Sequence, residues 1–422
     1  MNEIQTVKII DYTYDGLGIG KVDGFPIFVD KGVVGETLKV KITKMKKNLA
    51  FADIVQVIKE SDNRVRPVCE YYNECGGCHI MHMSYEEQLR FKTNHVEETL
   101  KRIGGVDIKV NDCVGMDNPY NYRNKLIIPF EGGKAGLYKK NTHDIIDIDK
   151  CYILNEEALE IVKYLKSSNL DLRNVLIRTS HNLDEIMVVL ITYKKVKVDV
   201  VDELLSRFKG IVSIVNNIND KNTNVVLGSD SYVLYGNDYY KDYLLGNEYK
   251  INHRSFYQVN SIQTEKLYKK AIESINVEDK NVVDAYCGIG TIGLSFAKKA
   301  RKVYGIEINE SAVLAARENA DLNNINNAEF YQGKAEKVIS KVIDKKIDIV
   351  ITDPPRKGCG EEFLQSLIDN DIKEVVYISC NVSTLARDIK YLSDYYDVLE
   401  VTPFDLFPHT YHVECVASLR KK

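Results

Sequence analysis

A cysteine near the carboxyl end of the chain, Cys380, follows directly after a short apolar run at residues 375–379. This run is rich in β-branched and aromatic residues and has the length of a buried strand. Ligands of open parallel α/β sheets bind just beyond the carboxyl ends of the strands. A cysteine at that place can act as a nucleophile toward a bound ligand, although the position considered alone favours a packing role.

A second group of residues predicts a site for an adenosine-type cofactor. Residues 281–285 predict a buried strand. A glycine-rich turn at 286–291 comes next, and a helix follows the turn. The next strand ends in Glu307, 17 residues beyond Gly290. Gly288 and Gly290 admit a ligand close to the backbone, and an acid at this offset accepts hydrogen bonds from a ribose diol. The third glycine of the dinucleotide fingerprint is missing, which favours S-adenosylmethionine over NAD.

Two further strands place polar side chains at the same edge of the predicted sheet. A strand at 347–352 ends in Asp353, and the prolines that follow make a stiff loop suited to gripping a flat base beside a methyl donor. Alternating residues at 411–419 predict a late strand that carries Glu414 and closes the sheet. By position alone, Glu414 is interpreted as an exposed charge on an edge strand. The alternation between these strands continues with helices at 310–323 and 334–343 and a strand at 329–331.

Four cysteines outside this region can converge on one inorganic centre. Cys69, Cys75 and Cys78 are separated by five and two residues, and the glycines between the last two let the backbone wrap closely. Cys151 is the best candidate for a fourth ligand. Four cysteines fit either zinc or an iron–sulfur cluster, and the spacing does not separate the two.

Residues 1–58 predict a small β domain. Alternating runs are separated by glycine-rich turns such as 15–20, a pattern that is typical of a barrel or sandwich. One turn is basic, which is consistent either with phosphate contacts or with a sheet edge that lysines protect. Its lysines are Lys39, Lys41, Lys44, Lys46 and Lys47.

A central α+β domain is expected at 59–250, before a cofactor-binding domain at 251–422. It contains Arg123 and Lys125 in an aromatic, basic and amide cluster, which either contacts RNA or forms a polar strand edge.

A helix is predicted at 84–103, where it can pack on the cofactor-binding domain. Ser84 and Glu87 predict a capping box at its start. Its expected apolar face consists of Leu89, Val96, Leu100 and Ile103.

The composition is that of a globular protein of two or three domains, with 422 residues, 44% hydrophobic and 28% charged. A net charge of −4 argues against a basic surface throughout, but local positive charge still allows an RNA partner. No apolar run approaches the ~20 residues that cross a bilayer, and no signal peptide is visible. We therefore expect a cytoplasmic protein whose nine cysteines are metal ligands, nucleophiles or buried thiols.

These motifs together resemble the RNA (uracil-5-)-methyltransferases. Five motifs occur in the family's order, at 255–260, 286–290, 353–356, 379–381 and 412–414. Residues 1–58 resemble the TRAM domain, an OB-like RNA-binding module. With this beginning and the four cysteines, the chain is most similar to the branch that acts on 23S ribosomal RNA.

The resemblance implies an α/β class I, Rossmann-like methyltransferase domain joined to an N-terminal OB-like β-barrel (TRAM) and a central domain that carries a [4Fe-4S] cluster. It implies that Cys380 is the nucleophile and Glu414 the base. The implied cluster ligands are Cys69, Cys75, Cys78 and Cys151. The residues implied to hold S-adenosylmethionine are Gln258, Tyr286, Glu307 and Asp353.

The chemistry of uracil agrees with these roles. C5 of the ring is too electron-poor to attack a methyl sulfonium directly, but a thiolate that adds to C6 makes C5 nucleophilic. A base must then remove the C5 proton so that the cysteine can leave. The target uridine must leave its stack, and Phe256 either stacks on it or packs in the core.

We therefore expect an enzyme that methylates C5 of a uridine in a single-stranded loop of 23S ribosomal RNA, with no membrane and no obligatory protein partner. One alternative keeps the chemistry but makes transfer RNA the substrate. The other is an RNA-binding protein whose cofactor site is idle. The joint presence of Gln258, Glu307, Cys380 and Glu414 argues against this last alternative.

Overall fold

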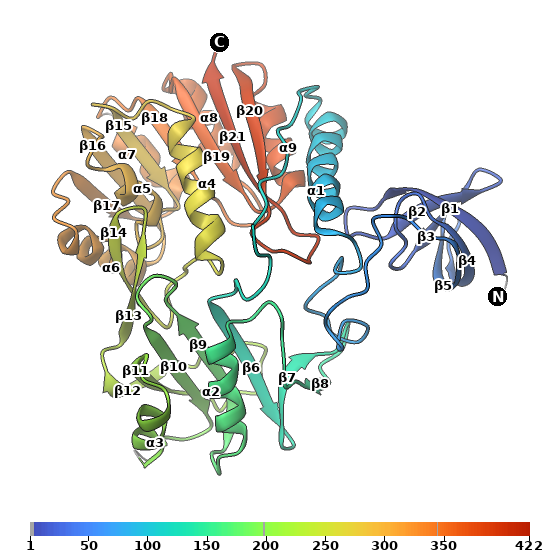
Figure 1. Cartoon of the computed structure of the whole chain (residues 1–422). Coiled ribbons are helices and arrows are strands. Elements are labelled where there is room, and N and C mark those ends of the chain that lie inside the picture. Colours follow the sequence, from blue (N-terminus) through green and yellow to red (C-terminus); the bar gives the residue numbers. More distant parts are fainter. Residues whose placement is uncertain (1–3, 197–198, 344) are drawn as a thin grey trace.

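The computed structural model describes residues 4–196, 199–343 and 345–422. Figure 1 shows an N-terminal barrel (blue) beside two larger parts, a central sheet (green) and a C-terminal α/β sheet (yellow to red). Among the described residues, no helix is long and apolar enough to cross a membrane.

The N-terminal barrel is closed by five strands in the order β1-β2-β3-β5-β4, which confirms the small β domain expected there. Gly18 and Gly20, expected in a turn, lie in β2 instead. A side chain at Gly20 would place its Cβ 2.1 Å from Val7 Cγ1, so the small barrel can close only over glycine at this position. The strands are β1 (Ile4–Tyr12), β2 (Gly18–Val22), β3 (Phe25–Val29), β4 (Thr37–Met45) and β5 (Ala50–Lys59).

The predicted helix at 84–103 is α1 (Tyr85–Thr99), followed by a wider π-helical turn, η1 (Leu100–Gly104). Ser84 accepts a hydrogen bond from Glu87 N as expected, but the Glu87 carboxylate accepts from Tyr12 Oη at 2.7 Å. The predicted capping box is therefore only half formed. The prediction that Ile103 lies on the apolar face is wrong, because the π-helical turn rotates it into solvent.

The central sheet has seven strands in the order β12-β11-β10-β9-β6-β7-β8. Two helices, α2 (Glu156–Lys166) and α3 (Asp199–Arg207), accompany it. Its strands are β6 (Lys125–Glu131), β7 (Lys134–Tyr138), β8 (Ile145–Asp147), β9 (Leu172–Thr179), β10 (Ile186–Thr192), β11 (Ile211–Ile218) and β12 (Asp230–Gly236).

A hairpin of β13 (Tyr239–Leu244) and β14 (Asn247–Asn252) joins this sheet to the C-terminal one. Its buried side chains Tyr240 and Tyr249 belong to one continuous core with Met187 of the central sheet and Val282 of the C-terminal sheet. The hairpin therefore packs against both parts, next to the predicted domain boundary at residue 250.

The C-terminal sheet has the order β17-β16-β15-β18-β19-β21-β20, parallel except for β21, which runs antiparallel to both neighbours. Alternate residues such as Val282 and Val283 enter the cores on its two faces. The doubly wound α/β sheet and its closing strand pair are confirmed, although the last strand begins at Glu414 rather than at Tyr411. The strands are β15 (Asn281–Ala285), β16 (Lys302–Glu307), β17 (Ala328–Gln332), β18 (Ile349–Thr352), β19 (Glu374–Ser379), β20 (Tyr396–Phe404) and β21 (Glu414–Lys421). The helices are α4 (Ser261–Glu273), α5 (Thr291–Phe296), α6 (Glu310–Leu322), α7 (Ala335–Ile343), α8 (Glu361–Asp369) and α9 (Val382–Leu392).

Candidate active site

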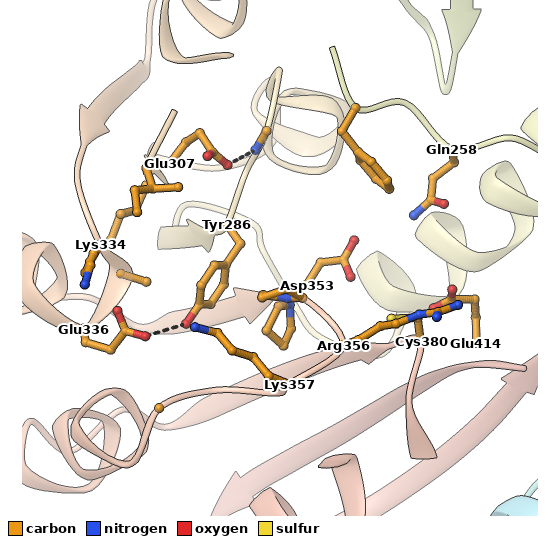
Figure 2. Close-up of a pocket in the computed structure, with 18 of the residues that line it drawn as sticks. Gln258, Tyr286, Glu307, Lys334, Glu336, Asp353, Arg356, Lys357, Cys380 and Glu414 are labelled. Carbon is orange, nitrogen blue, oxygen red and sulfur yellow. Dashed lines mark hydrogen bonds between the residues drawn. The ribbon is translucent and has the colours of Figure 1, made fainter. Parts of the chain in front are cut away.

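A cavity of about 1150 Å³ lies at the carboxyl ends of the parallel strands β15, β16, β18 and β19. Figure 2 shows Cys380 and Glu414 at one end of it, Glu307 toward the other, and Asp353 between. The structure thus brings the residues predicted from separate motifs into one site. The predicted residues that line it are Arg123, Phe256, Gln258, Tyr286, Gly288, Glu307, Asp353, Cys380 and Glu414.

Cys380 and Glu414 are neighbours on adjacent strands. Ser379, the last residue of β19, pairs with Cys415 of β21, so that the residues just beyond this pair, Cys380 and Glu414, lie side by side. Cys380 is half-buried and faces the cavity, which excludes the packing role. Glu414 is only 4% exposed, so it is not a solvated charge on an edge strand.

The electrostatics of this pair favour protonated groups. Burial, and then the charges of Glu414 and Asp353, raise the pKa of Cys380 to about 11, while Arg356 acts in the opposite direction. Burial and Asp353 raise the pKa of Glu414 well above its ordinary value. Burial alone raises the pKa of Asp353 to about 7. A thiol in this state must lose its proton during attack, and a carboxyl group of raised pKa is a suitable general base near neutral pH.

The glycine-rich turn forms the other end of the cavity. The Glu307 carboxylate accepts hydrogen bonds from Gly288 N at 3.1 Å and from Asn309 N at 2.8 Å, which fixes it beside the turn. Tyr286 adopts a positive φ of 63°, and its hydroxyl donates to Glu336 Oε1 at 3.4 Å. A non-glycine residue in this conformation is strained, and such strain clusters at ligand sites.

The Asp353 loop is tied to the residue after the cysteine. Asn381 caps α9 by accepting from Ser383 N at 3.1 Å, and its amide donates to Arg356 O at 3.0 Å. Asp353 N donates to Ala285 O at 3.4 Å, which links the loop to β15. The carboxyl group of Asp353 and the Cys380 thiol are therefore held in one rigid frame.

The predicted RNA-contacting residues divide into two groups. Phe256 is 70% exposed at the cavity, so the core-packing alternative is wrong for this residue. Arg123 lines the same cavity, whereas Lys125 lies outside the set of lining residues, with a pKa that burial and two arginines lower to about 8. The remaining predicted contacts are exposed on the barrel, with Lys44 near the end of β4 and Lys46 and Lys47 in the β4–β5 connection.

Several other lining residues were not predicted as site residues, and Glu336 and Phe407 are two of them. Glu336 follows the carboxyl end of β17, so the strand-end argument applied to every parallel strand could have identified it. Phe407 lies in the connection between β20 and β21, for which the sequence has no comparable pattern.

The four predicted metal-ligating cysteines line a second, smaller cavity, which residues 69–81 form with Leu137 of β7 and residues 148–153. Cys78 has its pKa raised by burial and by the charges of Cys151, Cys75 and Cys69, so all four lie close together. Within residues 4–196, 199–343 and 345–422, no three His, Cys, Asp or Glu side chains are placed to hold a single metal ion. Four neighbouring thiols are a donor set for either a zinc ion or an iron–sulfur cluster.

Comparison with known proteins gave matches along nearly the whole chain. A family model described as tRNA (Uracil-5-)-methyltransferase matches residues 84–422, and a TRAM domain model matches residues 2–55. An RNA methyltransferase of Listeria innocua, described as uncharacterized, is 44% identical over 446 residues, which covers 100% of this chain and 98% of that protein. A similar protein of Clostridium tetani is 42% identical over 426 residues, covering 95% and 93%.

A solved structure also matches over nearly the full length of the chain. The Pyrococcus abyssi tRNA (uracil-54, C5)-methyltransferase in complex with S-adenosyl-L-homocysteine has a TM-score of 0.79 and 28% sequence identity. The match covers 98% of this chain and 99% of that one.

Proposed function

Because the chain belongs to the tRNA (uracil-5-)-methyltransferase family, and is thus an S-adenosylmethionine-dependent RNA methyltransferase, we propose that it methylates C5 of a specific uridine in 23S ribosomal RNA through a covalent adduct on Cys380. The observation that carries this proposal is the pairing of a half-buried thiol with a buried carboxyl group, Glu414, in the cavity that also contains the glycine-rich turn.

In the proposed reaction, Cys380 Sγ bonds to C6 of the uracil as the thiol proton passes to solvent water, which leaves Glu414 ionised for the later step, and the ring electrons move toward O4. When bound, S-adenosylmethionine supplies the electrophilic methyl group that C5 takes. Glu414 then removes the proton from C5, the C6–Sγ bond breaks, and the thiolate is restored. Burial raises the pKa of Asp353 to about 7, so the protonated form present near neutral pH can donate a hydrogen bond to O4 as negative charge develops there.

The cofactor is proposed to lie between the glycine-rich turn and the Asp353 loop. Glu307, fixed by two backbone N–H groups, is placed to accept hydrogen bonds from the ribose diol. Tyr286, Gln258 and Gly288 line the same cavity, and the match to a structure that contains S-adenosyl-L-homocysteine supports this assignment.

A covalent trap tests the nucleophile. RNA that contains 5-fluorouridine has no C5 proton to lose, so the adduct cannot resolve after methyl transfer. We expect a stable protein–RNA complex on a denaturing gel with the parent protein and none with Cys380→Ala. A Cys380→Ala protein that still forms this complex would overturn the assignment.

The substrate class rests on the similarity to the 23S ribosomal RNA branch, and transfer RNA is the second candidate. The Pyrococcus abyssi structure, named as a transfer RNA enzyme, matches along 99% of its length, so an N-terminal barrel does not separate the two substrates. Mapping 5-methyluridine in both RNAs, with and without the gene, decides between them. Loss of the modification from transfer RNA alone would favour the second candidate.

We also propose that Cys69, Cys75, Cys78 and Cys151 hold a [4Fe-4S] cluster. No electron is required for methyl transfer, so its role is structural. Protein purified without oxygen should be brown and contain about four iron atoms per chain. Colourless protein that contains zinc would contradict this proposal.

The alternative of an RNA-binding protein with an idle cofactor site makes the opposite prediction for a binding experiment. Calorimetry should detect S-adenosylmethionine binding to the parent protein, with weaker binding to Glu307→Ala because the ribose loses its acceptor. Absence of binding to the parent protein would favour the alternative.

A further inference from the structure

The connection between β20 and β21, residues 405–413, forms one wall of the cavity and is tied to several other segments. We call it the 405–413 loop. It contributes Phe407 and His412 to the cavity, and the residue that follows it is Glu414. An irregular segment that is mostly buried must satisfy its backbone groups through partners elsewhere in the chain.

Its first residue, Asp405, forms a wholly buried ion pair with Lys92 of α1, both side chains being 0% exposed. The second carboxylate oxygen of Asp405 accepts from Tyr85 Oη at 3.0 Å, and Lys92 Nζ also donates to Phe407 O at 3.3 Å. A buried ion pair adds little net stability, because desolvation of both charges offsets their attraction. What it supplies here is one fixed position of the loop relative to α1.

The middle of the loop is held by three further segments. Tyr122 Oη of the central part donates to Pro408 O at 3.1 Å, and Asn260 at the start of α4 donates to Leu406 O at 3.0 Å. His79 N and Ile80 N, which directly follow the cysteine loop, both donate to the carbonyl oxygen of residue 409, at 2.9 and 3.1 Å.

Residue 409 is itself strained. His409 has a φ of 68°, Gln88 Oε1 accepts its N–H at 3.0 Å, and the Tyr120 ring stacks on its imidazole with centroids 4.9 Å apart. A strained residue persists only where its surroundings fix it, and such residues cluster at functional sites. Figure 1 shows α1 beside β20, the strand that leads into the loop.

Resting on the proposed function, we propose that Lys92 and Asp405 are positioning residues for the proton-removal step. They anchor the 405–413 loop so that Glu414, the first residue of β21, is aligned with C5 of the uracil. Cys380 and the glycine-rich turn lie on other elements, so addition to C6 and methyl transfer do not depend on this anchor. Loss of the anchor should therefore slow the second half of the reaction selectively.

The test replaces the whole pair, in Lys92→Met/Asp405→Leu, because an apolar pair avoids leaving one charge buried alone. We expect the thermal stability to equal or exceed that of the parent, and the rate of 5-fluorouridine trapping to stay within about threefold of the parent rate. Turnover on uridine RNA should fall about ten- to a hundredfold, because the general base Glu414 is misplaced. Methylated protein–RNA adduct should accumulate on uridine RNA, and KM for RNA should not change. Unchanged turnover, or an equal loss of trapping and turnover, would overturn the proposal.

Two further variants keep the test decisive. Tyr85→Phe removes one hydrogen bond from Asp405 and should show a smaller accumulation of adduct than the double variant. This variant tests the proposal even if the double variant fails to fold. If Tyr85→Phe accumulates no adduct, that result also counts against the proposal. Arg64→Met/Glu36→Leu removes a partly buried ion pair between the barrel and the segment that follows it, and should leave the ratio of trapping to turnover at the parent value. If the parent protein itself forms no 5-fluorouridine adduct, the proposed function fails, which is a separate result.

Discussion

Phe256 is the residue whose exposure is hardest to explain without a ligand. A side chain that is 70% exposed at the cavity contributes little to the core, and an aromatic ring there offers a surface for a base that has left its stack. Sequence alone left core packing and base stacking equally open, because the residues around Phe256 have no clear periodicity.

Phe256→Ala should weaken productive RNA binding by about 1–3 kcal/mol, the range measured for stacking of one base on an aromatic side chain. KM for RNA should rise about ten- to a hundredfold, with folding stability unchanged because the ring is exposed. Phe256→Trp keeps a stacking surface and should stay near the parent value. Steady-state kinetics with one RNA fragment measure both variants, and equal KM values for Phe256→Ala and the parent would contradict the stacking role.

Asp284 is a second residue whose state depends on its surroundings. Burial, and then the charges of Asp353 and Glu307, raise its pKa from 3.8 to about 7, although it accepts from Gly293 N at 2.7 Å. Its other oxygen is buried without a hydrogen-bond partner. Between about pH 4 and 7 the folded state therefore binds more protons than the unfolded state, and stability falls as pH rises through that range.

Asp284→Asn should flatten this part of the pH dependence. The amide oxygen still accepts from Gly293 N, and no charge has to be buried, so the variant should be on the order of 2–4 kcal/mol more stable than the parent near pH 8 and similar to it near pH 4. Urea unfolding of cofactor-free protein at both pH values provides the measurement. A variant whose stability falls with pH as steeply as that of the parent would refute the assignment.

At the scale of elements, β2 and α1 show how packing overrides local sequence. Gly18 and Gly20 have the composition of a turn, yet they extend a strand because the barrel wall closes over them. Glu87 has the spacing of a capping residue, yet its carboxylate bonds to Tyr12 of the barrel. In both cases a partner distant in sequence offers a better contact than the local one.

Gly20→Ala tests the closure of the barrel. The added Cβ would lie 2.1 Å from Val7 Cγ1 and 2.6 Å from Lys8 O, and because the second contact is backbone, the strands must move apart. We expect a loss of about 1–3 kcal/mol in barrel stability, typical of overpacking. Hydrogen exchange of β1 and β2 amides measures this loss, and Lys21→Ala, at an exposed position of the same strand, should leave exchange unchanged.

At the scale of the whole molecule, a net charge of −4 requires that affinity for RNA comes from local positive charge. The barrel carries exposed Lys44 near the end of β4 and exposed Lys46 and Lys47 in the turn that follows, well separated in sequence from the cavity. It is joined to the rest through contacts such as Tyr12 with Glu87 and Lys31 with Asn73. The barrel can thus bind phosphates while the C-terminal part binds the target base.

Lys46→Ala/Lys47→Ala should weaken RNA binding at low salt and reduce the slope of log affinity against log salt by about 2, one for each lost phosphate contact. The rate of methyl transfer at saturating RNA should not change. Lys298→Ala/Lys299→Ala removes two exposed lysines before β16, at the end of the sheet opposite the cavity, and should leave the slope unchanged. Equal slopes for both double variants would show that the barrel lysines do not contact phosphate.

The sequence by itself determined the parallel sheet and the residues at its strand ends, Glu307, Asp353 and Cys380, because strand periodicity and the polar residue that ends each strand are local properties. Only the tertiary structure decided the rest. The antiparallel register of β19 with β21 turned Glu414 from an apparent surface charge into the buried neighbour of Cys380. The Lys92–Asp405 pair joins residues more than three hundred positions apart, and no local pattern records such a contact because burial and pairing depend on how distant elements pack.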